Sequence, residues 1–262
     1  MESVGPVTRR PRRDRCRDPG HRAGDEGDHC SVNTLSEAFE KLGADHAALA
    51  LERLGAFNSH LPQGEAWSFD LHARTFTMGR TTIAIQVIGT FSAEHAAWVW
   101  AWDNASLQQF PEAIADAWRV REYGERYGIP EFVDRGVDLS GFADPRFGAE
   151  KLALIATAVL GAKGYAGVTT SGGFRAYLVS NDPAIPERGP RGPEHVSHYL
   201  RTAADWFPTA NPMTLAAAYA TGTGGRWMQV PGGLVVNLGE GSMTLHYREG
   251  RLDRVGPPVA LV

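Results

Sequence analysis

Apolar residues recur at the spacing of an α-helix in five stretches of the chain, which therefore predict five helices. The first stretch opens with Thr34-Leu-Ser-Glu37, which matches a capping box, and three of the others open with a proline at the first turn. The expected helices cover residues 34–57, 111–127, 148–162, 193–207 and 212–219.

Apolar and polar residues alternate in most of the remaining chain, which predicts β-strands. Residues 66–103 form an expected antiparallel β meander, with strands at 67–71, 74–78, 81–91 and the run that follows Ser92–His95. A hairpin is expected around Ser171-Gly-Gly173, with strands at 165–170 and 174–180. Prolines and turn pairs in residues 128–147 predict an irregular loop. Three short strands close the chain at 226–230, 234–238 and 242–247, with a last extended piece from Arg251.

The most informative run holds Trp98, Trp100 and Trp102 at alternate positions. In an extended strand these side chains share one face, with Val99 and Ala101 on the other. The tryptophan ladder is a core beneath the helix 111–127, the floor of a pocket for an apolar or planar ligand, or an exposed surface for a protein partner. We favour the core, with Trp100 inside it and Trp102 as the edge of any site.

Three polar residues, Asp103, Asn104 and Ser106, follow the ladder directly. They are either ligand-binding groups beside the tryptophans or side-chain caps of a strand-to-helix turn, which is the simpler interpretation. The candidate ligand- or partner-binding set is therefore Trp98, Trp100, Trp102, Asp103, Asn104 and Ser106.

These elements predict an α+β fold, an antiparallel β meander packed on helices, with a smaller helix-helix-three-strand segment at the C-terminus. We expect a disordered N-terminal tail over 1–32, an α+β domain over 33–182, a proline- and glycine-rich linker over 183–193 and a small segment over 194–262 that docks on the domain. The tail mixes seven arginines with six acidic residues and holds almost no apolar side chains. The tail is either a basic binding arm or, on the simpler interpretation, a segment translated from DNA upstream of the true start of the protein.

Composition narrows the possible partners. The net charge of −4 and the pI near 6.1 argue against a general nucleic-acid binder. No apolar run approaches the about 20 residues that span a bilayer, so we expect no membrane partner. The only cysteines are Cys16 and Cys30, and the tail lacks the apolar region of a signal peptide, so we expect a cytoplasmic protein. Arginine far outnumbers lysine, which is typical of proteins from GC-rich bacteria.

No catalytic motif stands out. His195 and His198 lie three apart, whereas the zincin motif places its histidines four apart around a glutamate, so the pair is a weak metal candidate. The glycine-rich run Thr221–Gly225 follows a helix instead of preceding one, which favours a helix cap over a phosphate loop. We therefore expect a protein without cofactor or metal that binds a protein partner or a small apolar ligand. The alternative is a hydrolase or metal-dependent enzyme that uses His195 and His198.

One family resemblance rests on three segments: Trp67-Ser-Phe-Asp-Leu71, the Val-Ile-Gly-Thr-Phe run at 87–91, and the tryptophan run with its downstream Asn104 and Ser106. Together they resemble an uncharacterised, largely actinobacterial domain-of-unknown-function family with a Trp-x-Trp-Ala-Trp strand. The resemblance covers about residues 34–182 and implies no activity or catalytic residue.

Overall fold

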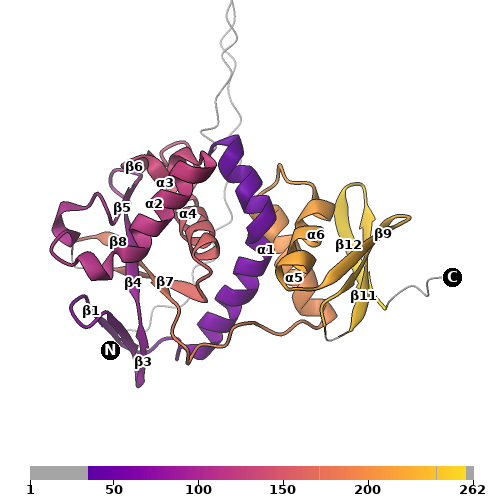
Figure 1. The fold of residues 1–262 in the computed structure, drawn as a ribbon, viewed down its shortest axis with the longest axis horizontal. Helices are drawn as coiled ribbons and strands as arrows, with labels where there is room; N and C mark the ends of the chain where they lie inside the picture. The colour runs from indigo at the N-terminus through magenta and orange to yellow at the C-terminus, as the bar shows by residue number, and fades with distance from the viewer. Residues whose placement is uncertain (1–34, 171, 240, 258–262) are drawn as a thin grey trace, which may run out of the picture. The chain divides into compact units, whose positions relative to one another are not determined.

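A computed structural model describes residues 35–170, 172–239 and 241–257 (Figure 1). The described part is α+β, as the sequence predicts, with six α-helices and three antiparallel sheets. The predicted N-terminal tail, residues 1–32, lies outside the described residues. The α-helices are α1 (Glu37–His60), α2 (Ala115–Tyr127), α3 (Pro130–Val133), α4 (Pro145–Val159), α5 (Pro193–Trp206) and α6 (Pro212–Gly222).

The three sheets have three, five and four strands. The first is β1 (Trp67–Asp70), β2 (Thr75–Met78) and β3 (Thr81–Ala84), in that order. The second has the order β6-β5-β4-β8-β7, with bounds Gly136–Asp138, Ala97–Trp100, Gln86–Ser92, Phe174–Ser180 and Gly164–Thr169. The third has the order β12-β11-β10-β9, with bounds Arg251–Gly256, Ser242–Arg248, Gly233–Asn237 and Arg226–Val230.

The start of α1 is capped by Ser36 rather than Thr34, which lies outside the described residues. The Ser36 hydroxyl accepts a hydrogen bond from Phe39 N at 3.1 Å and donates one to the Glu131 carboxylate at 2.8 Å. The same carboxylate accepts from the backbone N–H of Ser36. A distant acidic residue thus completes the cap, which a local motif search does not detect.

Three sequence predictions need correction. The expected strand 81–91 is two strands, because 81–84 pairs with β2 while 86–92 pairs with β5 and β8, and the chain changes sheets at the buried Ile85. The expected loop 128–147 contains α3, which Pro130 opens, and β6, which pairs with β5. The piece from Arg251 is a full fourth strand, β12, paired with β11.

The core of the five-stranded sheet lies against α4, which contacts β4, β5 and β7. The indoles of Trp98 and Trp100 are fully buried in this core. Gly89 on the neighbouring β4 makes room for one of them, since a Cβ there would lie 2.3 Å from the ring of Trp98. This close approach explains a glycine in the middle of a strand.

Helix α1 contacts α4 and β7 as well as α5 and α6, and so connects the two groups of elements (Figure 1). Residues 183–192 between β8 and α5 form neither helix nor strand, as their prolines predict. The segment is nevertheless fixed, because Ile185 is buried and the Arg191 guanidinium pairs with Glu52 of α1 at 2.9 Å. Among the described residues no helix is long and apolar enough to cross a membrane.

Candidate functional site

The tryptophan ladder lies almost wholly inside the protein. Trp98 and Trp100 are 0% exposed, and Trp100 Nε1 donates to the Glu131 carbonyl at 2.7 Å. Strand β5 ends at Trp100, so Trp102 lies in the following turn and is only 5% exposed. Its ring packs on Trp118 of α2, with centroids 5.8 Å apart. The expectation that Trp100 is core is confirmed.

The polar residues after the ladder form a turn. Asn104 caps a short 3-10 helix, Ala105–Leu107, by accepting from Ser106 N at 3.1 Å. Asp103 lies 3.7 Å from Arg135, and Ser106 is exposed. These contacts account for the residue types without a ligand. The ligand-binding interpretation of the ladder set stays a prediction.

The weak metal candidates His195 and His198 are both exposed on the first turns of α5. The described part of the chain contains no group of three or more His, Cys, Asp or Glu side chains that could hold a metal ion. Among the described residues, no third side chain therefore joins His195 and His198 as a metal ligand.

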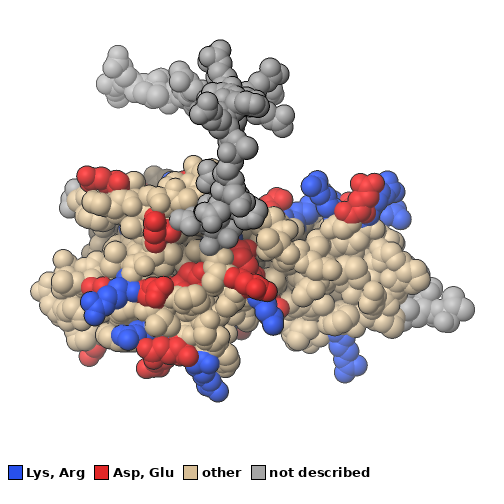
Figure 2. All heavy atoms as spheres, turned by 90° about the horizontal axis from the view of Figure 1, so that it is seen from above, with Lys and Arg blue, Asp and Glu red and all other residues tan. Residues whose placement is uncertain are grey.

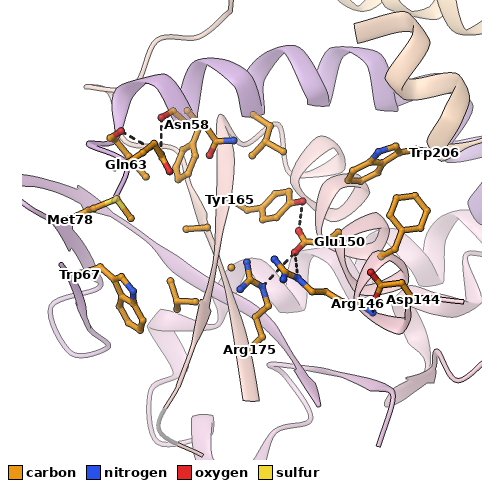
Figure 3. A pocket seen from close by; sticks show the side chains of 17 residues that line it. Asn58, Gln63, Trp67, Met78, Asp144, Arg146, Glu150, Tyr165, Arg175 and Trp206 are labelled. Carbon is orange, nitrogen blue, oxygen red and sulfur yellow. Dashed lines mark hydrogen bonds and ion pairs between the residues drawn. The ribbon is translucent and has the colours of Figure 1, made fainter. Parts of the chain in front are cut away.

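A different place gathers polar and aromatic side chains around an open space. A cleft of about 530 Å³ lies among the end of α1, the small sheet, the start of α4, the β7–β8 hairpin and the end of α5 (Figure 3). Trp67 and Met78 lie at one end of the view, and Trp206 lies at the other. Phe147 also lines the cleft, so its walls offer aromatic surface on two sides.

Glu150 is the centre of the polar groups in this cleft. It lies on α4, and its side chain is 19% exposed. Its carboxylate accepts from Tyr165 Oη at 2.7 Å and from Tyr177 Oη at 3.2 Å. One of its oxygens lies 3.5 Å from both Arg146 Nε and Arg175 Nε. The sequence folds this way because Glu150 faces the sheet, and the hairpin places both tyrosines and Arg175 on the face that meets α4.

The two tyrosines are held as neutral donors. Burial, reinforced by the negative charge of Glu150, raises the pKa of Tyr165 well above its usual range. The same causes, in the same order, raise the pKa of Tyr177. Glu150 is therefore surrounded by two O–H donors and two cations, an arrangement that orients the two arginines in the cleft.

Arg175 is the group in the cleft whose hydrogen bonds are incomplete. Its Nε atom is buried yet has no hydrogen-bond partner among the described residues; the Glu150 oxygen at 3.5 Å gives charge pairing only. Its guanidinium lies over the backbone of Gly167, where a Cβ would come within 2.5 Å of Nε. The Arg175 side chain is 23% exposed, so its other N–H groups can meet an acceptor in the cleft.

The cleft holds acidic as well as basic side chains, because Asp144 and Glu150 line it together with Arg146 and Arg175. Figure 2 shows acidic and basic side chains interspersed over the face that it draws. Around Glu150, by contrast, two guanidinium groups converge on one carboxylate and are turned toward it in Figure 3. The two guanidinium groups carry more N–H donors than the Glu150 carboxylate accepts, and these donors suit one anionic group of a small ligand.

A family model for a family of unknown function (DUF6882) matches residues 40–183, a little over half of the chain. The chain belongs to this family. No curated protein and no solved structure matched the chain. The resemblance to a family of unknown function is thus confirmed over nearly the residues expected from sequence.

The part of the chain that matches the DUF6882 family includes most of the cleft, with Arg146, Glu150, Tyr165 and Arg175. Trp206 lies outside the match, on α5. Sequence reasoning missed the cleft residues. One signal was present: Glu150 interrupts the apolar side of its helix, and an acidic residue at such a position is rarely left without a partner.

Proposed function

We propose that this protein binds a ligand that carries an apolar or planar body and an anionic group, and that the cleft around Glu150 is the binding site. The observation that carries the proposal is the pair of guanidinium groups of Arg146 and Arg175, which converge in the cleft on one Glu150 oxygen and leave further N–H groups for an acceptor from a ligand. A carboxylate or phosphate oxygen supplies such an acceptor, and arginine forms paired hydrogen bonds with both groups.

Two further features support this function. The exposed fraction of the Arg146 side chain is 56%, so its terminal N–H groups are open to a ligand while its Nε is held by Glu150. Trp67, with 40% of its surface exposed, and Trp206 offer aromatic faces for the rest of the ligand. This is the usual composition of a small-ligand site: mostly apolar walls and a few placed polar groups. The role proposed is binding, not catalysis.

We also propose a cytoplasmic location, which the absence of cysteine after residue 30 supports. The enzyme alternative based on His195 and His198 gains no specific observation from the described residues.

The test is equilibrium binding of matched small probes. Indole-3-acetate and phenyl phosphate carry the anionic group, and indole-3-acetamide is the neutral control. We expect the anions to bind and the amide to bind at least tenfold more weakly, measured by calorimetry at low salt. A hydrogen bond to a charged group contributes about 1.5–3 kcal/mol, which corresponds to roughly a 10- to 100-fold change in affinity.

Variants assign the binding to the cleft. Arg146→Gln removes an exposed cation with little risk to folding, and Arg175→Gln removes the buried one. Arg121→Gln is the matched control, because Arg121 also pairs with a glutamate four residues later, Glu125 at 3.0 Å, but on α2. Anion binding that survives both cleft variants, or that Arg121→Gln weakens equally, contradicts the proposal.

A further inference from the structure

Strand β7 forms one edge of the five-stranded sheet, and the cleft runs along it. The sheet order places β7 outermost, with β8 as its one partner strand in the described sheet; α1 packs on the Gly164 end of β7, where a Cβ would lie 2.4 Å from Phe57. Four consecutive residues of the strand, 165–168, line the cleft. A strand lines a cleft with consecutive residues when the cleft follows its edge, because a single face would contribute only alternate residues.

The register identifies which backbone groups face the cleft. Thr170 N donates to Phe174 O at 2.8 Å at the hairpin end, and the pairing continues without a shift to Gly164 opposite Ser180. Residues with hydrogen bonds to the partner strand alternate along an antiparallel pair. Ala166 and Val168 therefore bond to β8, while Tyr165 and Gly167 direct their N–H and C=O groups outward. Among the described residues, no hydrogen bond from another segment reaches these outward groups.

Unpaired backbone groups at a strand edge accept another strand. An incoming segment that pairs with Tyr165 and Gly167 gains up to four backbone hydrogen bonds, since each residue supplies one donor and one acceptor. The four lining residues span about 13 Å at about 3.3 Å per residue, which suits an extended segment of four or five residues.

The charged side chains beside the edge of β7 indicate which chemical group an added segment carries. The Arg175 guanidinium lies over Gly167, next to the outward groups, and Arg146 converges on the same Glu150 oxygen. We infer that the ligand of the cleft is an extended peptide with a carboxylate, which adds as a strand to the free edge of β7 and places that carboxylate on Arg175 and Arg146. This inference rests on the proposed function and specifies its ligand class. It uses strand addition, in which the main chain gives affinity and adjacent side-chain sites give specificity.

The first experiment uses a displayed library of random heptapeptides with free C-termini, selected against the full chain. We expect enriched peptides that end in or contain a carboxylate near an aromatic residue. Each peptide is then synthesised in three forms. The first is the free acid, the second has every carboxylate replaced by an amide, and the third carries a single N-methyl group at each backbone position in turn. N-methylation at alternate positions should weaken binding at least tenfold, and at the positions between them less than twofold, because only alternate N–H groups face β7.

The second experiment is hydrogen exchange read by NMR on the same samples. In the free protein the amides of Tyr165 and Gly167 should exchange faster than those of Ala166 and Val168, which bond to β8. Bound peptide should slow the exchange of Tyr165 and Gly167 at least tenfold. Indole-3-acetate, which has no backbone, should leave both unchanged.

The outcomes separate the two proposals. If small anions bind through Arg146 and Arg175 but no enriched peptide protects Tyr165 and Gly167, the strand-addition inference is wrong and the proposed function stands. If neither anions nor peptides depend on the two arginines, both are wrong. Peptides that bind equally to Arg146→Gln, Arg175→Gln and the parent chain also overturn the inference.

Discussion

The buried carboxylate of Glu52 allows a quantitative prediction. Glu52 is 0% exposed on α1; it pairs with Arg191 at 2.9 Å and accepts from Tyr219 Oη at 2.7 Å. The substitution Glu52→Gln keeps the size and the acceptor for Tyr219 but leaves the Arg191 guanidinium, 5% exposed, without a counter-charge. Removing one partner of a buried pair costs about 3–5 kcal/mol.

Urea unfolding followed by tryptophan fluorescence measures this cost. At a slope of about 2 kcal/mol per molar urea, the midpoint should fall by roughly 1.5–2.5 M. The double variant Glu52→Gln/Arg191→Met removes the unpaired charge, and its loss of stability should be smaller than the sum of the two single losses by about 2 kcal/mol or more. A loss below about 1 kcal/mol for Glu52→Gln, with additive single losses, would refute the claim that this pair fixes residues 183–192 on α1.

Three other outcomes follow from burial. Trp100→Ala should lower the unfolding free energy by about 3–5 kcal/mol, because it empties a fully buried site. Trp118→Ala should lower it by less than about 1 kcal/mol, because Trp118 is 40% exposed. Equal losses for the two variants would contradict the assignment of Trp100 to the core. Limited trypsin digestion should cut first after Arg188, which is exposed between the two anchored residues, Ile185 and Arg191, and a first cut within 66–127 would contradict this. Burial raises the pKa of four tyrosines in the folded protein: Tyr165, Tyr177, Tyr219 and Tyr247. The free energy of unfolding should therefore fall as the pH rises above about 10, because only the unfolded chain then ionises them freely. Absorbance at high pH should show their ionisation together with unfolding.

Local signals in the sequence predicted the local elements well. The prolines at 193 and 212 open α5 and α6, and Ser171-Gly-Gly173 separates the strands of the hairpin. In each case one residue type limits the backbone regardless of what packs on it. The change of sheets at Ile85 could not be predicted this way, because both halves of 81–91 alternate as one strand does.

The candidate site depends on contacts between distant segments, which a single sequence does not report. Glu150 and Tyr177 are 27 residues apart, and the buried pair of Glu52 and Arg191 is 139 residues apart. The ladder attracted attention because tryptophans are conspicuous, and it lies in the core, where Trp98 Nε1 and Trp102 Nε1 have no hydrogen-bond partner among the described residues. The cleft residues are ordinary charged and aromatic types, and only their convergence in space makes them a candidate site.

The most direct test of the cleft as a ligand site is an NMR titration of the arginine Nε–Hε signals of the full chain with indole-3-acetate. We expect the signals of Arg175 and Arg146 to shift with one common dissociation constant, while that of Arg121 stays in place. Both signals should move, because the two Nε atoms lie 3.5 Å from the same Glu150 oxygen and a bound anion changes the charge beside them. Saturable binding that leaves the Arg175 and Arg146 signals unmoved would contradict the account.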